Sequence, residues 1–329
     1  MDTITKDFAP VSVDPKGHVL PHSVNQKIFD ETIIQAELSH LKDAGHIEDG
    51  VQPIAIFITG QTGAGKAELS PDLWDAIKSR LPAHFVADSY NTYHPEYTSI
   101  VNSAPSRVSS ATGTDARKWL SMACNWCIDR KIDILLESAC RNLEEFMSLI
   151  STFHAAGYQV HVAIMAVPEC LSLLGIMVRY YKRYSEAQPG DPPPRSTSRT
   201  VHYETYDGLL AVADFIDKSS VADDVIVVRR NSLVSYQNYR STDGLWIRPA
   251  AALTSLDLER TRPLPQAEHA SFFVDYQWVE EKAGKDDVAA AMLENIEASL
   301  AALNSTGGRM SSSFPALKPL DVKQWLFGK

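Results

Sequence analysis

The chain has 329 residues, of which 44% are hydrophobic and 22% are charged, and its formal net charge is −10 at neutral pH. This length suffices for one large domain or two with a substantial core, and the composition is that of an ordinary globular protein. The negative charge argues against general nucleic-acid binding, and no apolar run approaches the ~20 residues that cross a bilayer.

The N-terminal segment and the cysteines bear on the compartment. Residues 1–17 contain no apolar stretch of the kind that a signal peptide carries. Four cysteines in a chain of this length do not make a disulfide framework. We therefore expect a cytoplasmic protein with reduced cysteines. Since the chain as a whole is acidic, a phosphate ligand would need positive partners gathered locally.

The first elements in chain order are an irregular lead-in, a helix and a strand. Residues 1–22 contain several prolines and predict an irregular segment. Apolar side chains at helical spacing predict a helix over residues 28–41. The apolar run 54–58 then predicts a buried strand, and residues 69–81 have helical spacing again.

Between that strand and the following helix lies a glycine-rich loop with the pattern G-x-x-x-x-G-K. It comprises Gly60, Gln61, Thr62, Gly63, Ala64, Gly65 and Lys66, followed by Ala67. Strand, loop and helix together indicate a P-loop, in which backbone N–H groups and the helix N-terminus surround phosphate oxygens. Lys66 would place its ammonium on the β- and γ-phosphates, whereas Ala67 lacks the hydroxyl with which Ser or Thr holds Mg²⁺. The alternative is an incidental glycine turn, and the flanking strand and helix favour the P-loop.

The next part of the chain alternates between strand and helix. The pattern predicts strands at 84–87, 132–136, 160–167 and 225–228, and helices at 116–130 and 143–156. This order is typical of an α/β fold, here a P-loop kinase-like parallel sheet flanked by helices, with helical additions at both ends. Ligands of such sheets lie beyond the carboxyl ends of the strands. Asp88 and Glu137 follow strand ends, so we expect them beside the P-loop.

Residues 179–199 differ in composition from the rest of the chain. This segment holds five basic residues against two acidic ones, together with a run of prolines. A solvated loop with scattered arginines is one interpretation. Because the segment belongs to a chain with a P-loop, we favour a lid that grips phosphate groups.

Seven short segments in order carry a resemblance to a known family. They are residues 60–66, 88–95, 136–141, 156–158, 165–168, 179–180 and 195–202. With these segments the chain resembles the zeta-toxin family of P-loop kinases, whose best-known members are bacterial toxins that phosphorylate UDP-N-acetylglucosamine. The resemblance covers roughly residues 52–240, and it implies that ATP and Mg²⁺ are the cofactors.

The resemblance also implies catalytic roles. Lys66 and the P-loop amides would hold the triphosphate of ATP. Asp88 matches the general base that takes the proton from the acceptor hydroxyl, a task suited to a carboxylate near phosphates. Arg179 and Arg195 match arginines that neutralise the transferring phosphoryl group.

On the acceptor side the resemblance has departures. Arg141 matches an acceptor-binding arginine, and Glu137 would hold a metal-bound water or orient Arg141. Ser121 stands where the toxins carry a glutamate that grips the sugar, and Leu149 replaces a threonine that faces the acceptor. With Ala67 in place, Mg²⁺ would depend on water and carboxylates such as Asp88 or Glu137. UDP-N-acetylglucosamine is therefore the default acceptor, and relatives that phosphorylate NAD show that the acceptor can change.

The remaining features concern organisation and a second motif. We expect a lead-in and helix at 1–50, a kinase domain at 51–240 and a helical extension with a flexible tail at 241–329. The extension should contain a linker at 261–265, a helix at 286–303, a flexible segment at 304–315 and an apolar end at 325–327. Its helix could pack on the kinase domain or bind a partner, and packing is favoured. Cys124 and Cys127 form a single C-x-x-C, which indicates core neighbours rather than zinc ligands.

Two functional hypotheses follow. The first is a kinase that phosphorylates a hydroxyl of a nucleotide sugar or a related phosphorylated acceptor, with a small antitoxin-like protein as a further partner. The second is a catalytically weakened P-loop protein that binds nucleotide and acts through partners. Ala67, Ser121 and Leu149 favour the second hypothesis. The retained lysine, base and two arginines favour the first.

Overall fold

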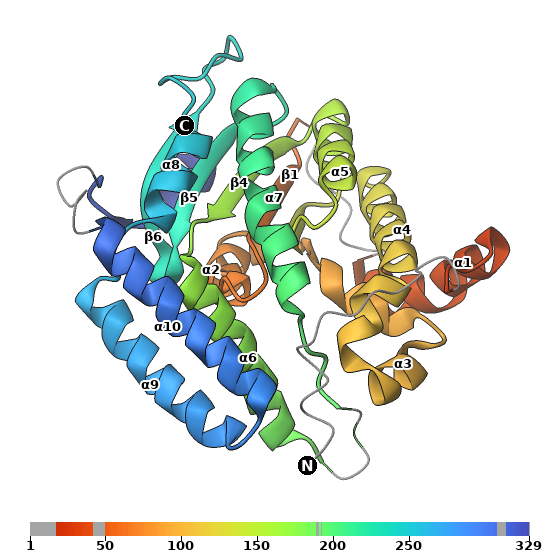
Figure 1. Ribbon diagram of the computed structural model, residues 1–329. Helices are drawn as coiled ribbons and strands as arrows, with labels where there is room; N and C mark the ends of the chain where they lie inside the picture. Colours follow the sequence, from red (N-terminus) through yellow and green to blue (C-terminus); the bar gives the residue numbers. More distant parts are fainter. Residues whose placement is uncertain (1–17, 42–49, 189–190, 192, 308–313, 329) are drawn as a thin grey trace.

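A seven-stranded sheet forms the centre of the molecule (Figure 1). The computed structural model describes residues 18–41, 50–188, 191, 193–307 and 314–328. The sheet order is β2-β3-β1-β4-β5-β6-β7. The strands are β1 (Ile54–Thr59), β2 (Ala83–Val86), β3 (Ile134–Ser138), β4 (Gln159–Met165), β5 (Asp224–Arg229), β6 (Leu233–Tyr239) and β7 (Lys318–Pro319).

The first five strands are parallel and the last two are antiparallel to their neighbours. The predicted α/β fold with a parallel sheet is thus confirmed for β1 to β5, whereas β6 and β7 were not predicted. The turn from β5 to β6 is only three residues long, and Asn231 and Ser232 in it adopt positive φ angles of 57° and 53°. Such a short connection joins antiparallel strands, because a parallel crossover needs a dozen residues or more.

Helices cover both faces of the sheet. The first helix, α1 (His22–Ile28), continues through η3 (Phe29–Leu38) and η4 (Ser39–Leu41). The other helices are α2 (Lys66–Ile77), α3 (Tyr97–Ser103), α4 (Val108–Ile128), α5 (Leu143–Ala155), α6 (Glu169–Glu186), α7 (Arg199–Lys218), α8 (Ala252–Arg260), α9 (Gln266–Ala283), α10 (Asp287–Gly307) and α11 (Val322–Phe327). One face carries η3, α4, α5, α7 and α8, and the other carries α2, α6, α9, α10 and α11.

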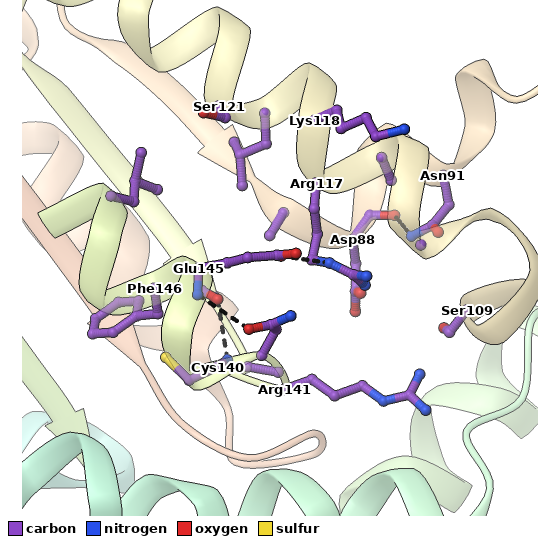
Figure 2. Close-up of a pocket in the computed structure, with 18 of the residues that line it drawn as sticks. Asp88, Asn91, Ser109, Arg117, Lys118, Ser121, Cys140, Arg141, Glu145 and Phe146 are labelled. Atoms are coloured by element: carbon purple, nitrogen blue, oxygen red, sulfur yellow. Dashed lines mark hydrogen bonds and ion pairs between the residues drawn. The ribbon is translucent and has the colours of Figure 1, made fainter. Parts of the chain in front are cut away.

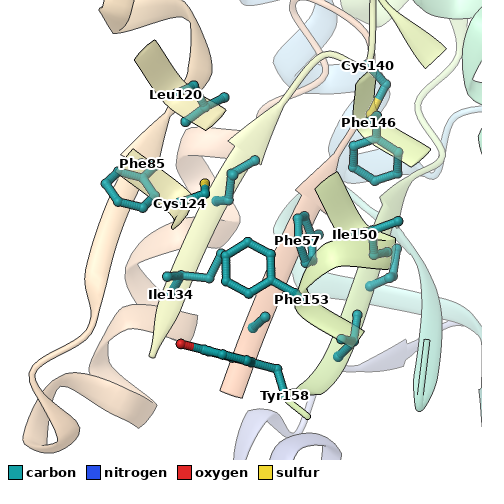
Figure 3. Packing of buried hydrophobic residues seen from close by; sticks show 14 of the residues in the cluster. Phe57, Phe85, Leu120, Cys124, Ile134, Cys140, Phe146, Ile150, Phe153 and Tyr158 are labelled. Carbon is teal, nitrogen blue, oxygen red and sulfur yellow. The ribbon is translucent and has the colours of Figure 1, made fainter. Parts of the chain in front are cut away.

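Strand β1 is buried along its whole length and separates two hydrophobic clusters. Phe57 points into the first cluster, where its ring meets Phe146 and Phe153 edge-on at 5.8 and 5.7 Å between centroids (Figure 3). Ile56 and Ile58 point to the opposite face, into the second cluster. Because side chains alternate along a strand, a run that is apolar at every position belongs between two layers.

Several predicted boundaries were wrong. The first helix begins at His22, and the helix expected from residue 116 begins at Val108. The basic segment from residue 179 is helical as far as Glu186, because it is the last part of the amphipathic helix α6, which was not predicted. Asp88 lies in η6 (Ala87–Tyr93), a 3₁₀ segment that follows β2.

The C-terminal part of the chain packs on the sheet's second face. Figure 1 shows α9 and α10 beside α6, and α11 contacts α2 with Trp325 and Leu326 buried. Packing of the C-terminal helix is therefore confirmed, while the three domain boundaries remain predictions. Residue 304 belongs to α10 rather than to a flexible segment, and residues 1–17 and 308–313 lie outside the described part. No helix within the described ranges is long and apolar enough to cross a membrane.

Candidate functional site

The glycine-rich loop turns sharply between β1 and α2. Gly63 and Gly65 have φ angles of +81° and +94°, a region that side chains other than glycine rarely adopt. A Cβ atom on Gly63 would also lie 2.0 Å from the carbonyl oxygen of Ser172 in α6. Glycine at position 63 is thus required both by the backbone angle and by the close approach of α6.

Three contacts fix the loop from outside. The side chain of Gln61 donates to the carbonyl of Val167 at 2.7 Å, and Arg230 donates to the carbonyl of Gly63 at 2.8 Å. The backbone N–H of Thr62 donates to the hydroxyl of Thr205 in α7 at 3.3 Å. The loop is therefore tied to three other segments of the chain.

A stack of side chains beneath the loop reaches it from α8. The guanidinium of Arg260 lies 3.8 Å from the ring centre of Tyr206, and Tyr206 stacks on His202 at 5.7 Å between centroids. Arg260 also donates a long hydrogen bond of 3.4 Å to the side-chain oxygen of Gln61. His202 accepts or donates a 2.8 Å hydrogen bond with Ser172, and burial lowers its pKa to about 4, so it is neutral at pH 7.

Lys66 is the first residue of α2 and folds back over the loop. Its ammonium donates to the carbonyls of Gly60 at 2.6 Å and Gln61 at 3.2 Å. Burial lowers the pKa of Lys66, the positive charge of Arg179 lowers it further, and the negative charge of Asp88 partly opposes both effects. The lysine, the carboxylate and the arginine are thus close enough to influence one another.

Asp88 and Arg195 form an ion pair next to the loop. The Nη2 atom of Arg195 lies 2.7 Å from Oδ2 of Asp88, whose side chain is half exposed. Arg195 is the main reason why the pKa of Asp88 lies below its ordinary value, with a smaller contribution from Lys66 and an opposing one from burial. The backbone of Asp88 is anchored because Asn91 donates to its carbonyl and Thr112 in α4 donates to Asn91.

Arg179 reaches the same region from α6. Its guanidinium donates to the hydroxyl of Thr197 at 3.0 Å, and burial together with the charge of Arg195 lowers its pKa to about 10. Ser196, Thr197 and Ser198 are themselves buried. The segment that carries Arg195 is therefore packed into the molecule and is not a solvated loop.

Glu137 lies near the end of β3 with 6% of its surface exposed. His84 hydrogen-bonds to its Oε1 at 3.0 Å. Burial alone would raise the pKa of Glu137, but the hydrogen bonds from His84 and Ser70 and the charge of Lys66 outweigh it and lower the pKa. Arg141 pairs instead with Glu204 of α7, at 2.8 Å from Nε to Oε2.

A cavity of about 810 Å³ opens beside the P-loop. Its wall includes Thr62 of the loop and five further residues singled out from the sequence, namely Asp88, Ser121, Arg141, Leu149 and Arg195. The predicted site residues Lys66, Glu137 and Arg179 do not line this cavity. The predicted site is thus divided into a loop side with Lys66 and a cavity side, and Asp88 and Arg195 stand between them.

The order of these parts matches a known family. The zeta toxin family model matches residues 39–241.

The chain belongs to the zeta toxin family.

Relatives with this fold come from streptococci and enterococci. The chain is 21% identical over 187 residues to toxin zeta of Enterococcus hirae, which covers 56% of this chain and 64% of that protein. It is 25% identical over 133 residues to toxin PezT of Streptococcus pneumoniae serotype 4, covering 40% and 52%. The matches thus span less than two thirds of the length of these relatives.

A solved structure supports the fold. It was described in a study of the PezAT chromosomal toxin–antitoxin system of Streptococcus pneumoniae, and it is similar to this chain with a TM-score of 0.63 at 18% identity. The similarity covers 82% of this chain and 100% of that one. The resemblance to the zeta toxin family and the α/β fold are both confirmed.

Within this zeta toxin fold, Mg²⁺ would have to be held without a P-loop hydroxyl. Ala67 offers only a methyl group. Glu137 and Asp88 both contribute to the electrostatic surroundings of Lys66, and Mg²⁺ is commonly bound by one or two carboxylates with phosphates and retained water. An ion held beside Lys66 would therefore take its protein ligands from these two carboxylates. No cluster of three or more metal-ligating side chains is found among the residues that the structure describes.

The cysteines are buried. Cys124 and Cys127 lie in the first hydrophobic cluster, and burial raises the pKa of Cys127 to about 12. Cys140 lines the cavity, but burial raises its pKa to about 11, so its thiol stays protonated. The interpretation of the C-x-x-C as core neighbours agrees with this packing.

Sequence reasoning missed one ion pair in the cavity wall. Arg117 of α4 pairs with Glu145 of α5, at 2.5 Å from Nε to Oε2 (Figure 2). The available signal was the position of Arg117 one helical turn before Ser121, which places both on one face of the helix. Its partner could not be found in this way, because Glu145 belongs to a different helix.

Proposed function

We propose that the protein is an ATP-dependent phosphotransferase that transfers a phosphoryl group to a hydroxyl of a small phosphorylated acceptor. The loop from Gly60 to Ala67 would hold the triphosphate, and the cavity would hold the acceptor. The observation that carries this proposal is the Asp88–Arg195 ion pair, which stands where the P-loop side meets the cavity. A protein that only binds nucleotide has no need of a carboxylate and an arginine there.

On the nucleotide side, Lys66 exchanges the carbonyls of Gly60 and Gln61 for phosphate oxygens. The positive charge of Arg195 lowers the pKa of Arg179, so a phosphoryl group bound by both arginines would relieve their repulsion. Bound Mg²⁺ would neutralise phosphate charge, with Glu137 or Asp88 reaching it directly or through water. Positioning and charge neutralisation are the main protein contributions to phosphoryl transfer.

On the acceptor side, Asp88 serves as the general base. When Arg195 turns to the incoming phosphate, the pKa of Asp88 rises and the carboxylate becomes a better proton acceptor. The acceptor oxygen attacks the γ-phosphorus, Asp88 takes the hydroxyl proton, and the bond from the γ-phosphorus to the bridging oxygen breaks to release ADP. A general base of this kind contributes ~10²–10⁴-fold to the rate.

The acceptor proposed by default is UDP-N-acetylglucosamine. The cavity volume of about 810 Å³ is in the range for a nucleotide sugar or a dinucleotide. Arg141 is proposed to contact its diphosphate, with Ser121 as a further acceptor-side residue. Glu137, which lies outside the cavity wall, is proposed to act on the acceptor side only through bound water or metal. We also propose a small antitoxin-like partner, because one solved relative comes from a toxin–antitoxin system.

The second candidate is a nucleotide-binding protein with weakened catalysis. It is favoured by Ala67 at the Mg²⁺ position and by Ser121 and Leu149 in the cavity wall. One experiment separates the candidates: ATP turnover with Mg²⁺, alone and with a panel of nucleotide sugars and dinucleotides. If the protein is a kinase, ADP should be released only when an acceptor is present. The Asp88→Asn variant should abolish this release. A wild-type protein that binds ATP but releases no ADP with any acceptor of the panel would support the second candidate.

A further inference from the structure

Arg117 lines the acceptor cavity, and its guanidinium makes few contacts with the protein. Its Nε atom pairs with Glu145, and its Nη2 atom makes only a long 3.3 Å hydrogen bond to Thr114. About a third of the side chain, 36%, is exposed. Figure 2 shows Arg117 from α4 and Arg141 from the loop after β3 reaching toward the space beside Asp88.

Gly113 leaves room for this guanidinium. It lies one turn before Arg117 inside α4 and lines the same cavity. A Cβ atom at position 113 would lie 3.0 Å from Nη1 of Arg117, which is closer than an ordinary contact. Glycine inside a helix lowers its stability relative to alanine. Alanine at position 113 would therefore require the guanidinium of Arg117 to shift within the cavity.

The charges of the cavity wall favour an anionic occupant. Four cationic side chains line it, against the carboxylates of Asp88 and Glu145: Arg117, Lys118, Arg141 and Arg195. Lys118 is engaged with Asp115 at 3.3 Å and Arg195 with Asp88 at 2.7 Å. The other two are Arg117 and Arg141, and each of them pairs with one exposed carboxylate, Glu145 and Glu204 respectively. This local concentration of positive charge contrasts with the net charge of −10 of the whole chain.

The surroundings of Glu145 would stabilise its carboxylate after loss of the ion pair with Arg117. It lies in the first turn of α5, where Asn142 caps the helix by accepting from the backbone N–H of Glu145. A carboxylate at a helix N-terminus is stabilised by the helix dipole. With 48% of its side chain exposed, Glu145 would also regain water. An exposed ion pair of this kind contributes little stability, whereas guanidinium binds phosphate with two parallel hydrogen bonds.

We propose that Arg117 is a second anion-binding residue of the acceptor cavity, which exchanges Glu145 for a phosphate group of the acceptor. Arg141 makes the corresponding exchange from Glu204. The proposal rests on the proposed function and specifies its acceptor class: a molecule whose phosphate or diphosphate lies between α4 and the loop after β3. Arg117 thereby selects acceptors by charge and takes no part in proton transfer.

The test uses inorganic pyrophosphate as the probe. The full chain is first saturated with a non-hydrolysable ATP analogue and Mg²⁺, so that the P-loop is filled, and pyrophosphate is then titrated by calorimetry. Arg117→Gln should weaken pyrophosphate binding about tenfold, the loss expected for one charge-assisted contact. Arg117→Lys should restore part of it. Arg130→Gln is the matched control, because Arg130 lies just after the C-terminus of α4, stacks on Trp126 of that helix at 3.9 Å and does not line the cavity.

Two further variants separate binding from structure. Glu145→Gln removes the competing carboxylate charge and should tighten pyrophosphate binding. Gly113→Ala should maintain or raise the melting temperature and weaken pyrophosphate binding, because its methyl group would lie 3.0 Å from Nη1 of Arg117 and shift the guanidinium. A purely structural role for Arg117 would make Gly113→Ala and Arg117→Gln change stability and leave binding alone.

The pyrophosphate experiment can fail independently of the proposed kinase function. Equal pyrophosphate affinity of wild type and Arg117→Gln, or no binding by the wild type, would overturn the role of Arg117. ATP turnover and binding of the ATP analogue are measured separately and bear on the kinase assignment. Arg117-dependent pyrophosphate binding without any turnover would support this inference and count against the kinase.

Discussion

The ammonium of Lys66 donates a 2.6 Å hydrogen bond to the carbonyl oxygen of Gly60, six residues earlier in the same loop. The carbonyl oxygens of Gly60 and Gln61 thus accept hydrogen bonds from the lysine of their own loop. Nucleotide binding must replace this hydrogen bond with contacts to phosphate oxygens, which are negatively charged and therefore bind an ammonium more strongly.

The first prediction concerns this exchange. Lys66→Ala should weaken ATP binding tenfold or more, by about 1.4 kcal/mol at least, because the β- and γ-phosphates lose their cationic partner. Calorimetric titration with ATP measures the effect, and thermal unfolding checks the fold. Lys78→Ala is the control, since Lys78 is exposed and pairs with Asp75 at the other end of α2. Unchanged ATP affinity in Lys66→Ala would remove the P-loop assignment.

The second prediction concerns Asp88 and Arg195. Asp88→Asn should spare ATP binding and reduce phosphoryl transfer by ~10²–10⁴-fold, the effect of losing a general base. Arg195→Ala should reduce transfer by ~10³-fold or more, since it removes a charge that meets the transition state. Both rates are followed by ADP release with the best acceptor of the panel. Full activity of Asp88→Asn would show that another group takes the proton.

The third prediction concerns the missing hydroxyl. Ala67→Thr should lower the Mg²⁺ concentration that supports half-maximal turnover, because a direct ligand replaces water. A titration of activity with Mg²⁺ measures this shift, and Ala67→Val controls for the added bulk. The same Mg²⁺ dependence in both variants and the wild type would mean that the ion is held elsewhere.

The fourth prediction concerns His202 and the pH dependence of stability. Burial lowers its pKa to about 4 from the ordinary 6.5, so the unfolded chain binds a proton between these values and the folded chain does not. The free energy of unfolding is therefore highest above pH 6.5 and falls as the pH drops toward 4. At pH 5 the loss from this group amounts to about 2 kcal/mol.

Urea unfolding at pH 7 and pH 5 tests this contribution. His202→Gln should show a smaller difference between the two pH values than the wild type, whatever its absolute stability. His154→Gln, at an exposed position of α5, should keep the wild-type difference. An unaltered difference in His202→Gln would show that the histidine does not remain neutral in the folded protein.

Local patterns predicted the centre of the fold and the family. The alternation of apolar strands and helices identified β1 to β5, and the P-loop spacing identified Lys66, because both signals lie within short stretches of chain. Strand β6 was not predicted because its sequence mixes apolar and polar residues, and most of them are only partly buried. Strand β7 is two residues long and pairs with β6 across 80 residues or more of sequence, which no local pattern reveals.

The candidate site was predictable only in part for the same reason. Asp88 and Arg195 were each found from the family pattern, but their pairing joins residues 107 positions apart. The ion pairs of Arg117 with Glu145 and of Arg141 with Glu204 likewise depend on how α4, α5 and α7 pack. Their roles in catalysis and acceptor binding remain predictions.

The stack of Arg260, Tyr206 and His202 has a consequence for how this protein can diverge. Arg260 lies beyond residue 241, where the zeta toxin match ends, yet it touches Gln61 in the P-loop. A substitution in the appended part can therefore alter nucleotide affinity without changing any family residue. Exchange of this part between relatives would leave Gln61 and the Tyr206 ring without their cation. We therefore expect nucleotide affinity to depend on residues on both sides of position 241.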